Sequence, residues 1–162
     1  MSKQTQILKI LEKNARATIE EIAVLAGITY DEAAAIISEM EDRKIIFGYK
    51  ALIDWDKTEE ENVSAFIELK VRPQLGDGFD SVAKKIMYEY PNVKSISLMS
   101  GGFDLLVEID GNNMKDVALF VAEHLSPMDC ILSTTTHFVL RRYKKDGIIL
   151  EDKSKDERRM TL

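Results

Sequence analysis

The sequence has little cysteine and no long apolar run. Cys130 is the single cysteine among 162 residues, so an internal disulfide is excluded and a reducing compartment is indicated. Residues 1–6 are polar, and no apolar stretch approaches the length that crosses a membrane. We therefore expect no signal peptide, no transmembrane helix and no membrane partner. With 45% hydrophobic residues, the chain can still bury a core, and we expect a cytoplasmic protein.

Positive charge is also scarce. The formal net charge is −6. Residues 1–54 hold seven Lys or Arg against nine Asp or Glu, residues 55–139 hold seven against fourteen, and residues 140–162 hold eight against five. The acidic excess lies in the middle of the chain. Charge alone does not suggest a nucleic-acid partner, although a DNA-facing end is compatible with this distribution.

Three short helices are expected at the start of the chain. Apolar residues recur at helical spacing in three stretches: Ile7–Leu11, Ile19–Leu25 and Tyr30 to about Arg43. Thr18 and Glu21 stand at the start of the second helix, and Thr29 and Glu32 at the start of the third. Each pair has the spacing of a capping box, in which the threonine hydroxyl and the glutamate carboxylate accept from each other's backbone amides.

The connection between the second and third helices has the features of a helix-turn-helix. Gly27 supplies the positive φ that ends a helix, and Ile28 turns inward. Further on, Ile45-Ile46 and Ala51–Ile53 flank Gly48 and would form the two strands of a wing. The sequence thus predicts, in residues 1–54, a winged helix-turn-helix domain that binds double-stranded DNA. A three-helix bundle with a hairpin, used only for protein contacts, is the alternative.

A different pattern follows the polar, acidic segment 55–62, which we interpret as a linker. Strands and helices then alternate over residues 63–143: strand 65–71, helix 78–90, strand 93–99, strand 103–109, helix 114–125 and strand 129–143. Pro91 and Pro127 end the two helices. The βαββαβ order predicts an α+β, ferredoxin-like domain, with a four-stranded antiparallel sheet and both helices on one face.

This topology leaves one face of the sheet bare. An RNA-recognition module has the same element order, but it needs stacking aromatics and basic residues on its third strand. Residues 102–108 offer one aromatic and two acids there, so RNA is not the expected partner. Burial against copies of the same chain fits better and predicts a homo-oligomer.

With these elements in place, the chain resembles the Lrp/AsnC (leucine- or asparagine-responsive, feast/famine) family of transcription regulators. The resemblance runs from about residue 5 to residue 143 and rests on the order and spacing of short motifs: Ile7–Leu11, Asn14–Thr18, Glu21–Ala23, Gly27–Thr29, Ile45–Tyr49 and Gly101–Leu106. It implies a DNA-binding regulator whose assembly and DNA binding respond to a small effector, commonly an amino acid. It also implies homodimers formed through the sheets, which associate into tetramers, octamers or larger rings.

The resemblance places the effector near the loop 101–104 and the start of the last strand. Gly101 and Gly102 would let backbone amides approach a carboxylate, and Asp104 could accept from an α-ammonium group. The predicted effector-binding residues are Ser100, Gly101, Gly102, Asp104, Ser133, Thr134, Thr135 and Thr136. The competing interpretation is that the two glycines only form a hairpin turn, Asp104 caps it, and the threonine run reflects strand propensity.

The third helix departs from the family's usual pattern of serine and several arginines in its first two turns. Between Thr29 and Asp42 there is no Lys or Arg, and there are five acids, although basic residues supply most phosphate and guanine contacts. The predicted DNA-binding residues are Thr29, Tyr30, Ala34, Ser38, Arg43, Lys44 and Lys50. One subunit should bind weakly, and several heads on one oligomer would bind through avidity. A metabolite-sensing oligomer that has lost direct DNA reading is the alternative function.

No catalytic residue, cofactor or metal site is expected. His124 and His137 are the candidates for base chemistry near neutral pH, and neither His-x-x-x-His nor Cys-x-x-Cys spacing occurs. The chain also resembles the sirohaem decarboxylases, which share this two-domain layout and use histidine, so an enzyme of that kind is a further alternative, but the acidic residues 55–139 disfavour a poly-carboxylate porphyrin. The charged tail 144–162 is expected to be solvated and mobile, unless Ile148–Leu150 adds a short strand or packs on a neighbour.

Overall fold

The computed structural model describes residues 1–72 and 78–150. The chain forms two compact units, one spanning Met1–Ile53 and the other beginning at Asp54, and each is described by itself. Within the described ranges, no helix is long and apolar enough to cross a membrane.

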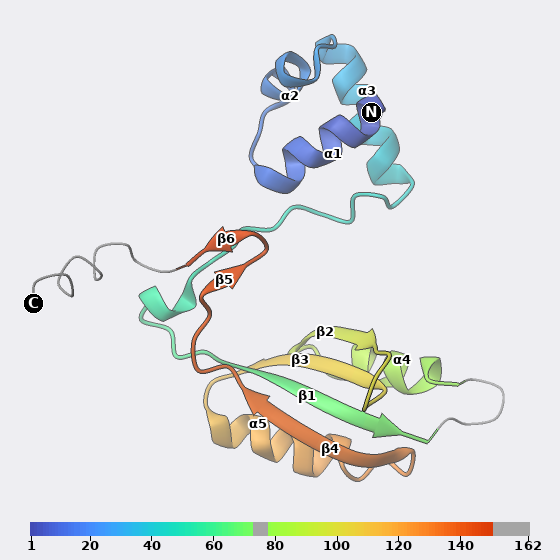
Figure 1. Ribbon diagram of the computed structural model, residues 1–162, viewed down its shortest axis with the longest axis vertical. Coiled ribbons are helices and arrows are strands. Elements are labelled where there is room, and N and C mark those ends of the chain that lie inside the picture. The colour runs from blue at the N-terminus through green and yellow to red at the C-terminus, as the bar shows by residue number, and fades with distance from the viewer. Residues whose placement is uncertain (73–77, 151–162) are drawn as a thin grey trace, which may run out of the picture. The chain divides into compact units, whose positions relative to one another are not determined.

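Three helices make the first unit (Figure 1): α1 (Lys3–Lys13), α2 (Ile19–Ala26) and α3 (Tyr30–Asp42). Their inward residues recur at helical spacing and form one core: Ile7, Ile22, Ala23, Ala33, Ile37 and Met40. Ile7, Ile22 and Met40 are at most 1% exposed, and full burial of such a side chain stabilises the fold by about 1.5–3 kcal/mol. The three predicted helices are confirmed.

The two expected capping boxes differ from each other. At α2 both halves form, because the Glu21 amide donates to Thr18 Oγ1 at 3.2 Å and the Thr18 amide donates to Glu21 Oε2 at 2.9 Å. At α3 the Glu32 amide donates to Thr29 Oγ1 at 3.2 Å. The Glu32 carboxylate, however, accepts from Lys3 Nζ on α1 at 2.6 Å. The second box is therefore only half formed, since an ammonium group is a stronger partner for the carboxylate than a backbone amide.

The turn between α2 and α3 forms as predicted. Gly27 has a φ of 65°, in the left-handed region. Its amide donates to the Val24 carbonyl at 3.3 Å, and the Ile28 amide donates to the Ala23 carbonyl at 3.0 Å. This pair of bonds is a Schellman motif, which ends α2, and Ile28 packs on the core of the unit. Together α2, the turn and α3 make a helix-turn-helix.

The two strands expected for a wing do not form. Residues 45–54 contain no strand, and Gly48 lacks the positive φ that a tight hairpin turn requires. Instead, the chain reverses at Lys44, which has a φ of 55°. The amides of Ile45 and Ile46 then both donate to the Met40 carbonyl, at 2.8 and 3.1 Å. Because these bonds tie the first apolar pair to the end of α3, the predicted hairpin is wrong.

The second unit contains the predicted sheet. It begins with a short 3-10 helix, η1 (Trp55–Lys57), inside the segment predicted as a linker. The elements that follow are β1 (Val63–Val71), α4 (Asp80–Glu89), β2 (Val93–Leu98), β3 (Leu105–Gly111), α5 (Met114–Phe120), the π turn η2 (Val121–Leu125) and β4 (Ile131–Phe138). The four strands pair antiparallel in the order β2-β3-β1-β4. This is the predicted ferredoxin-like arrangement, which is confirmed.

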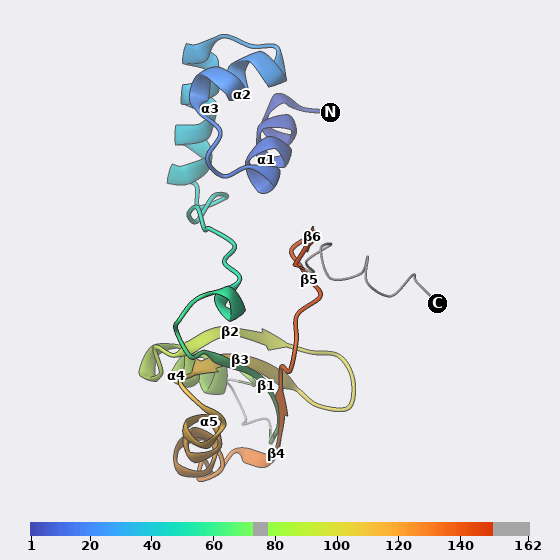
Figure 2. The same cartoon turned by 90° about the vertical axis from the view of Figure 1, so that its left-hand side faces the viewer.

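Both helices lie on one side of the sheet (Figure 2). The core joins alternate residues of β1 and β3 to the inner faces of α4, α5 and η2: Ala65, Ile67, Leu69, Val71, Val82, Ile86, Leu105, Val107, Ile109, Val117, Phe120, Val121 and Leu125. Gly111 lets the start of α5 approach closely, because a Cβ atom there would lie 2.8 Å from Val117 Cγ2. The intervening residues of β1, including Phe66, Glu68 and Lys70, lie on the other face, which neither helix covers.

The last strand of the sheet is shorter than expected. β4 ends at Phe138, opposite Ala65, and the Val139 amide still donates to the Ser64 carbonyl at 2.9 Å, next to Val63, the first residue of β1. The chain continues into a separate hairpin of β5 (Lys144–Lys145) and β6 (Ile148–Ile149) (Figure 1). The predicted tail therefore contains a short strand, but this strand does not join the sheet. Residues 151–162 of that tail lie outside the described residues.

Candidate DNA-binding helix and effector loop

The outer side of α3 carries the polar residues expected to contact DNA. Because Ala33, Ile37 and Met40 face the core, the four-residue spacing of Tyr30, Ala34 and Ser38 places them along one outer side of the helix. Tyr30 and Ser38 are exposed and Ala34 is half-buried. Thr29 lies at the N-cap, where its hydroxyl already accepts the Glu32 amide. This side of the helix can offer a phenol, a hydroxyl and a methyl group to a partner.

Two acidic side chains near the end of α3, Glu39 and Glu41, accept hydrogen bonds from polar groups that could otherwise contact DNA. The Arg43 guanidinium donates to Glu39 at 2.9 Å, and Tyr49 Oη donates to Glu41 at 2.9 Å. Partial burial, the hydrogen bond to Glu41 and the negative charge of that carboxylate raise the pKa of Tyr49 above its ordinary value. Asp31 and Asp42 are exposed on the same helix. The α3 region is therefore as poor in free positive charge as the sequence predicted, since Glu39 already pairs with Arg43.

Two other predicted phosphate contacts, Lys44 and Lys50, are exposed beyond the end of α3. Lys44 lies at the chain reversal with its positive φ. Lys50 lies in the extended segment that replaces the expected wing. Neither lysine has an ion pair among the residues that the structure describes, so both ammonium groups are available to an anionic partner.

The loop of residues 99–104 joins β2 to β3, and Asp104 ties it to the end of β1. Asp104 Oδ2 accepts the Val71 amide at 2.7 Å, and the Asp104 amide donates to the Leu69 carbonyl at 2.9 Å. The Met99 amide donates to the Asp104 carbonyl at 2.8 Å. Asp104 is thus a structural residue as well as a candidate ligand for an ammonium group. Each carboxylate oxygen has two lone pairs, and Oδ1 makes no hydrogen bond with the described residues.

The two glycines of this loop are open to solvent. A Cβ atom at Gly101 or Gly102 would contact nothing within 4 Å, and neither residue has a positive φ. The loop backbone therefore does not require glycine for its conformation or packing. Without side chains, however, the backbone amides remain accessible from outside, which is what a carboxylate ligand needs.

The four hydroxyl residues of β4 do not share one face. Thr134 pairs with Leu69 and Thr136 with Ile67, so both lie on the helix-covered face, where they are half-buried. Ser133 and Thr135 are exposed and lie on the bare face. Strand alternation separates these residues, so the structure divides the predicted hydroxyl run into two pairs.

The effector loop and the start of β4 meet at one end of the sheet. Asp104 contacts Val71, which pairs with Ile131, and Ser133 pairs with Lys70. Lys70 was not among the predicted site residues, yet its exposed side chain lies on the bare face at this same end. The alternation along β1 could have indicated it, because it places Lys70 opposite to Leu69 and Val71.

The acidic side chains of Glu68 and Glu108 on the bare face each have a partner. His137 Nε2 lies 3.1 Å from Glu68 Oε1. The Arg142 guanidinium lies 2.8 Å from Glu108 Oε1 and 5.7 Å from the centre of the Phe66 ring. A face on which charges are already paired around an aromatic ring is easier to desolvate than one with isolated charges.

The two histidines do not form a shared site. His137 lies on the bare face of the sheet, whereas His124 belongs to η2 and stacks near Tyr90 and Phe120, with ring centres 5.2 and 5.5 Å away. No group of three or more His, Cys, Asp or Glu residues that could hold a metal ion occurs in residues 1–72 or 78–150.

Comparisons with known proteins agree with this architecture. Residues 64–149 match the model of the Lrp/AsnC ligand binding domain. The HTH-type transcriptional regulator YugG of Bacillus subtilis is 49% identical over 96% of this chain and 94% of its own. The proline dehydrogenase transcriptional activator of Rhodobacter capsulatus is 25% identical over 83% of this chain and 86% of its own.

Solved structures share the fold at lower identity. The transcriptional regulator NMB0573 of Neisseria meningitidis, in complex with L-Met, superposes with a TM-score of 0.73 at 23% identity and covers 90% of this chain and 92% of its own. Escherichia coli AsnC superposes with a TM-score of 0.68 at 20% identity, over 88% of this chain and 93% of its own.

A helix-turn-helix followed by a ferredoxin-like ligand-binding domain defines an effector-responsive transcription regulator. More specifically, the chain belongs to the Lrp/AsnC family.

Proposed function

We propose that α3 reads operator DNA with its outer side. Tyr30 and Ser38 would bond to base edges, Ala34 would contact thymine methyl groups, and Thr29 would lie against the backbone near the N-terminus of the helix. Arg43, Lys44 and Lys50 would bind phosphates. The observation that carries this proposal is the helix-turn-helix geometry, with its Schellman turn at Gly27 and an exposed polar row on α3.

Binding by a single head is weak in this proposal. Asp31 and Asp42 repel phosphates, and Glu39 competes for Arg43. Linked heads compensate, because a second head on the same oligomer binds at an effective concentration in the millimolar range when its linker is short and flexible. We therefore propose that DNA binding depends on assembly into homodimers and higher oligomers, in the cytoplasm where the DNA is.

The effector in this proposal is an amino acid bound at the loop 100–104. The free Oδ1 of Asp104 would accept from the α-ammonium group, and the open amides at Gly101 and Gly102 would donate to the carboxylate. Ser100, Ser133 and Thr135 would supply hydroxyls near the same end of the sheet, whereas Thr134 and Thr136 face the helices. The L-Met complex of the Neisseria protein supports an amino-acid ligand.

The bare sheet face is where we propose that subunits meet. Phe66 and Leu106 are half-buried there, and the Glu68–His137 and Glu108–Arg142 pairs flank them. No catalytic step is proposed, because His137 is engaged by Glu68 and His124 stacks on aromatic rings on the helix side of the sheet.

A mobility-shift titration with the region upstream of the protein's own coding sequence tests this function. At low salt the assembled protein should retard that fragment, and affinity should fall steeply as salt is raised. Lys50→Gln should reduce the slope of log affinity against log salt by about 0.9, the value for one phosphate contact. Lys84→Gln, which removes an exposed lysine of α4, is the matched control and should leave the slope unchanged. If the properly assembled oligomer gives no retardation, the protein is a metabolite-sensing oligomer without direct DNA reading.

The effector is tested separately by thermal unfolding in the presence of single amino acids. A ligand at 100 times its Kd stabilises the folded state by about 2.7 kcal/mol, which raises the apparent Tm by many degrees in a domain of this size. An amino acid that raises Tm and also changes the retardation links the two sites. No shift with any amino acid contradicts the effector proposal and leaves the DNA proposal standing.

A further inference from the structure

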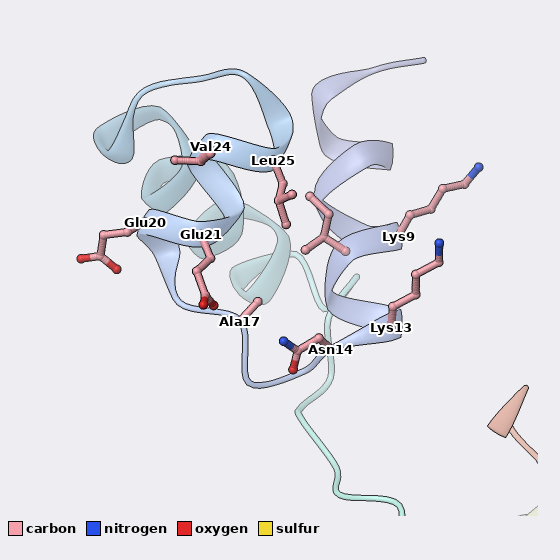
Figure 3. A pocket seen from close by; sticks show the side chains of 9 residues that line it. Lys9, Lys13, Asn14, Ala17, Glu20, Glu21, Val24 and Leu25 are labelled. Atoms are coloured by element: carbon pink, nitrogen blue, oxygen red, sulfur yellow. The ribbon is translucent and has the colours of Figure 1, made fainter. Parts of the chain in front are cut away.

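The first unit carries an apolar groove between α1 and α2, with a volume of about 780 Å³. Ile10, Ala17, Val24 and Leu25 supply its apolar lining. It opens on the side of these helices that faces away from α3 (Figure 3). Val24 and Leu25 are 81% and 68% exposed, so nothing within the described chain covers them.

The composition of α2 makes this exposure unusual. Ile22 and Ala23 of this helix enter the core, while the next two apolar residues, Val24 and Leu25, point outward. A helix that is apolar on both sides is normally buried on both sides. The second apolar side of α2 therefore needs a partner surface.

Charged residues flank the groove with opposite sign on its two sides. Lys9 and Lys13 extend from α1 on one side, and Glu20 lies on α2 at the other (Figure 3). None of the three has an ion pair among the residues that the structure describes. Glu21 also lines the groove, but its carboxylate accepts the Thr18 amide in the capping box.

We propose that this groove docks onto the same groove of a second copy of the chain. A two-fold axis that runs along the groove places the lysine side of each copy against the glutamate side of the other, and therefore places Val24 and Leu25 of α2 against Ile10 of α1 in the other copy. This arrangement is self-complementary, as a two-fold interface has to be. An axis across the groove would instead bring like charges together, so the charge pattern selects one orientation.

The contact goes beyond DNA and effector binding, since it requires neither. Its apolar part comprises only a few side chains, so it forms when another part of the chain already holds two copies together at high effective concentration. Because the groove opens away from α3, docking leaves the outer side of each α3 uncovered. Two heads that associate in this way would still present both DNA-contacting helices.

Zero-length carbodiimide cross-linking of the full-length protein tests the proposal. Protein labelled with ¹⁵N is mixed with unlabelled protein, dissociated and reassembled without DNA, and cross-linked peptides are identified by mass spectrometry. Mixed-isotope links from Lys9 or Lys13 to Glu20 are expected, because only two different copies can produce them. Links confined to a single copy, links from these residues to residues 151–162, or no links at this groove would overturn the proposal.

The Leu25→Asp variant checks that the apolar contact drives the association. It should reduce the yield of mixed-isotope links by about tenfold or more, because a carboxylate would have to be desolvated without a partner. Leu25 is mostly exposed, so the variant should fold normally, and its circular dichroism confirms this. Tyr88→Asp, at an 81% exposed position on α4, is the matched control and should leave the yield unchanged. An unchanged yield in Leu25→Asp would contradict the contact.

Discussion

Replacing Asp104 separates its structural role from its proposed role as an effector ligand. Its carboxylate accepts the Val71 amide at 2.7 Å, and Val71 is only 3% exposed. In Asp104→Ala this amide loses its acceptor in a place that water barely reaches. In Asp104→Asn the side-chain amide oxygen can still accept, although the negative charge is gone.

The expected cost follows from this geometry. A buried backbone donor left without a partner costs about 1–3 kcal/mol. For a domain of roughly 60–100 residues, each kcal/mol lowers Tm by about 4–8 °C. At about 2 kcal/mol, Asp104→Ala should therefore lower the Tm of the second unit by roughly 8–16 °C. Asp104→Asn should lower this Tm by about half as much or less, because the hydrogen bond to the Val71 amide remains and only the negative charge that strengthens it is lost.

Calorimetry at matched protein concentration measures both effects. Without ligand, the order of Tm should be wild type, then Asp104→Asn, then Asp104→Ala. With the amino acid that stabilises the wild type, both variants should lose most of the ligand-induced shift, because neither offers an anionic acceptor to the α-ammonium group. A Tm for Asp104→Ala within a degree or two of wild type would refute the structural reasoning. A full ligand-induced shift in Asp104→Asn would move the effector site elsewhere.

Three further predictions follow from single contacts. Gly111→Ala should destabilise the second unit by about 1–3 kcal/mol in denaturant unfolding, because its Cβ would lie 2.8 Å from Val117 Cγ2 in a packed core; a neutral result would mean that α5 shifts freely. Thr18→Ala should destabilise the first unit by about 1 kcal/mol through loss of its N-cap, whereas Thr18→Ser should be nearly neutral; equal losses in both variants would contradict the capping role. The pKa of Tyr49 is raised by burial and by Glu41, so the Tyr49–Glu41 contact should persist below the ordinary tyrosine pKa of about 10 and disappear as pH rises through the higher folded value. The difference between the tyrosinate absorbance titrations of wild type and Tyr49→Phe should be a component that titrates above that ordinary value, and a difference at or below the ordinary value would contradict the assignment.

Local signals in the sequence predicted much of the fold. The Thr18–Glu21 box and Gly27 mark both ends of α2 by mechanisms that operate within one turn of helix. The alternation along β1 predicted which of its residues are buried. These features depend on residues that are close together in the chain, so they can be predicted from the sequence alone.

The features that were missed depend on distant partners. Glu32 has the spacing of a capping box, but Lys3 from another helix takes its carboxylate. Apolar residues stand before and after Gly48, which is the pattern of two wing strands. The backbone amides of Ile45 and Ile46, however, donate to the end of α3, and no strand forms there. The last strand was predicted too long, because its pairing depends on β1, which is distant in the sequence: the pairing ends at Ala65 and Phe138, followed by one bond from the Val139 amide to the Ser64 carbonyl.

The candidate sites were partly predictable for the same reason. The sequence indicated Asp104 and the glycine loop, but not that Asp104 also holds the end of β1. The sequence indicated the four hydroxyl residues of β4, but only the register against β1 shows that Ser133 and Thr135 lie on the bare face and Thr134 and Thr136 on the other. The alternation along β1 placed Lys70 on the bare face, and the register then placed it beside Ser133.

Fluorescence anisotropy tests most directly whether the outer side of α3 reads DNA. A labelled duplex from the protein's own upstream region is titrated at low salt with wild type, Ser38→Asp, and Ser126→Asp as an exposed control in the second unit. We predict that Ser38→Asp weakens binding by at least about tenfold, or 1.4 kcal/mol, with unchanged oligomer size and helix content, while Ser126→Asp binds like wild type. Equal binding by wild type and Ser38→Asp would contradict the claim.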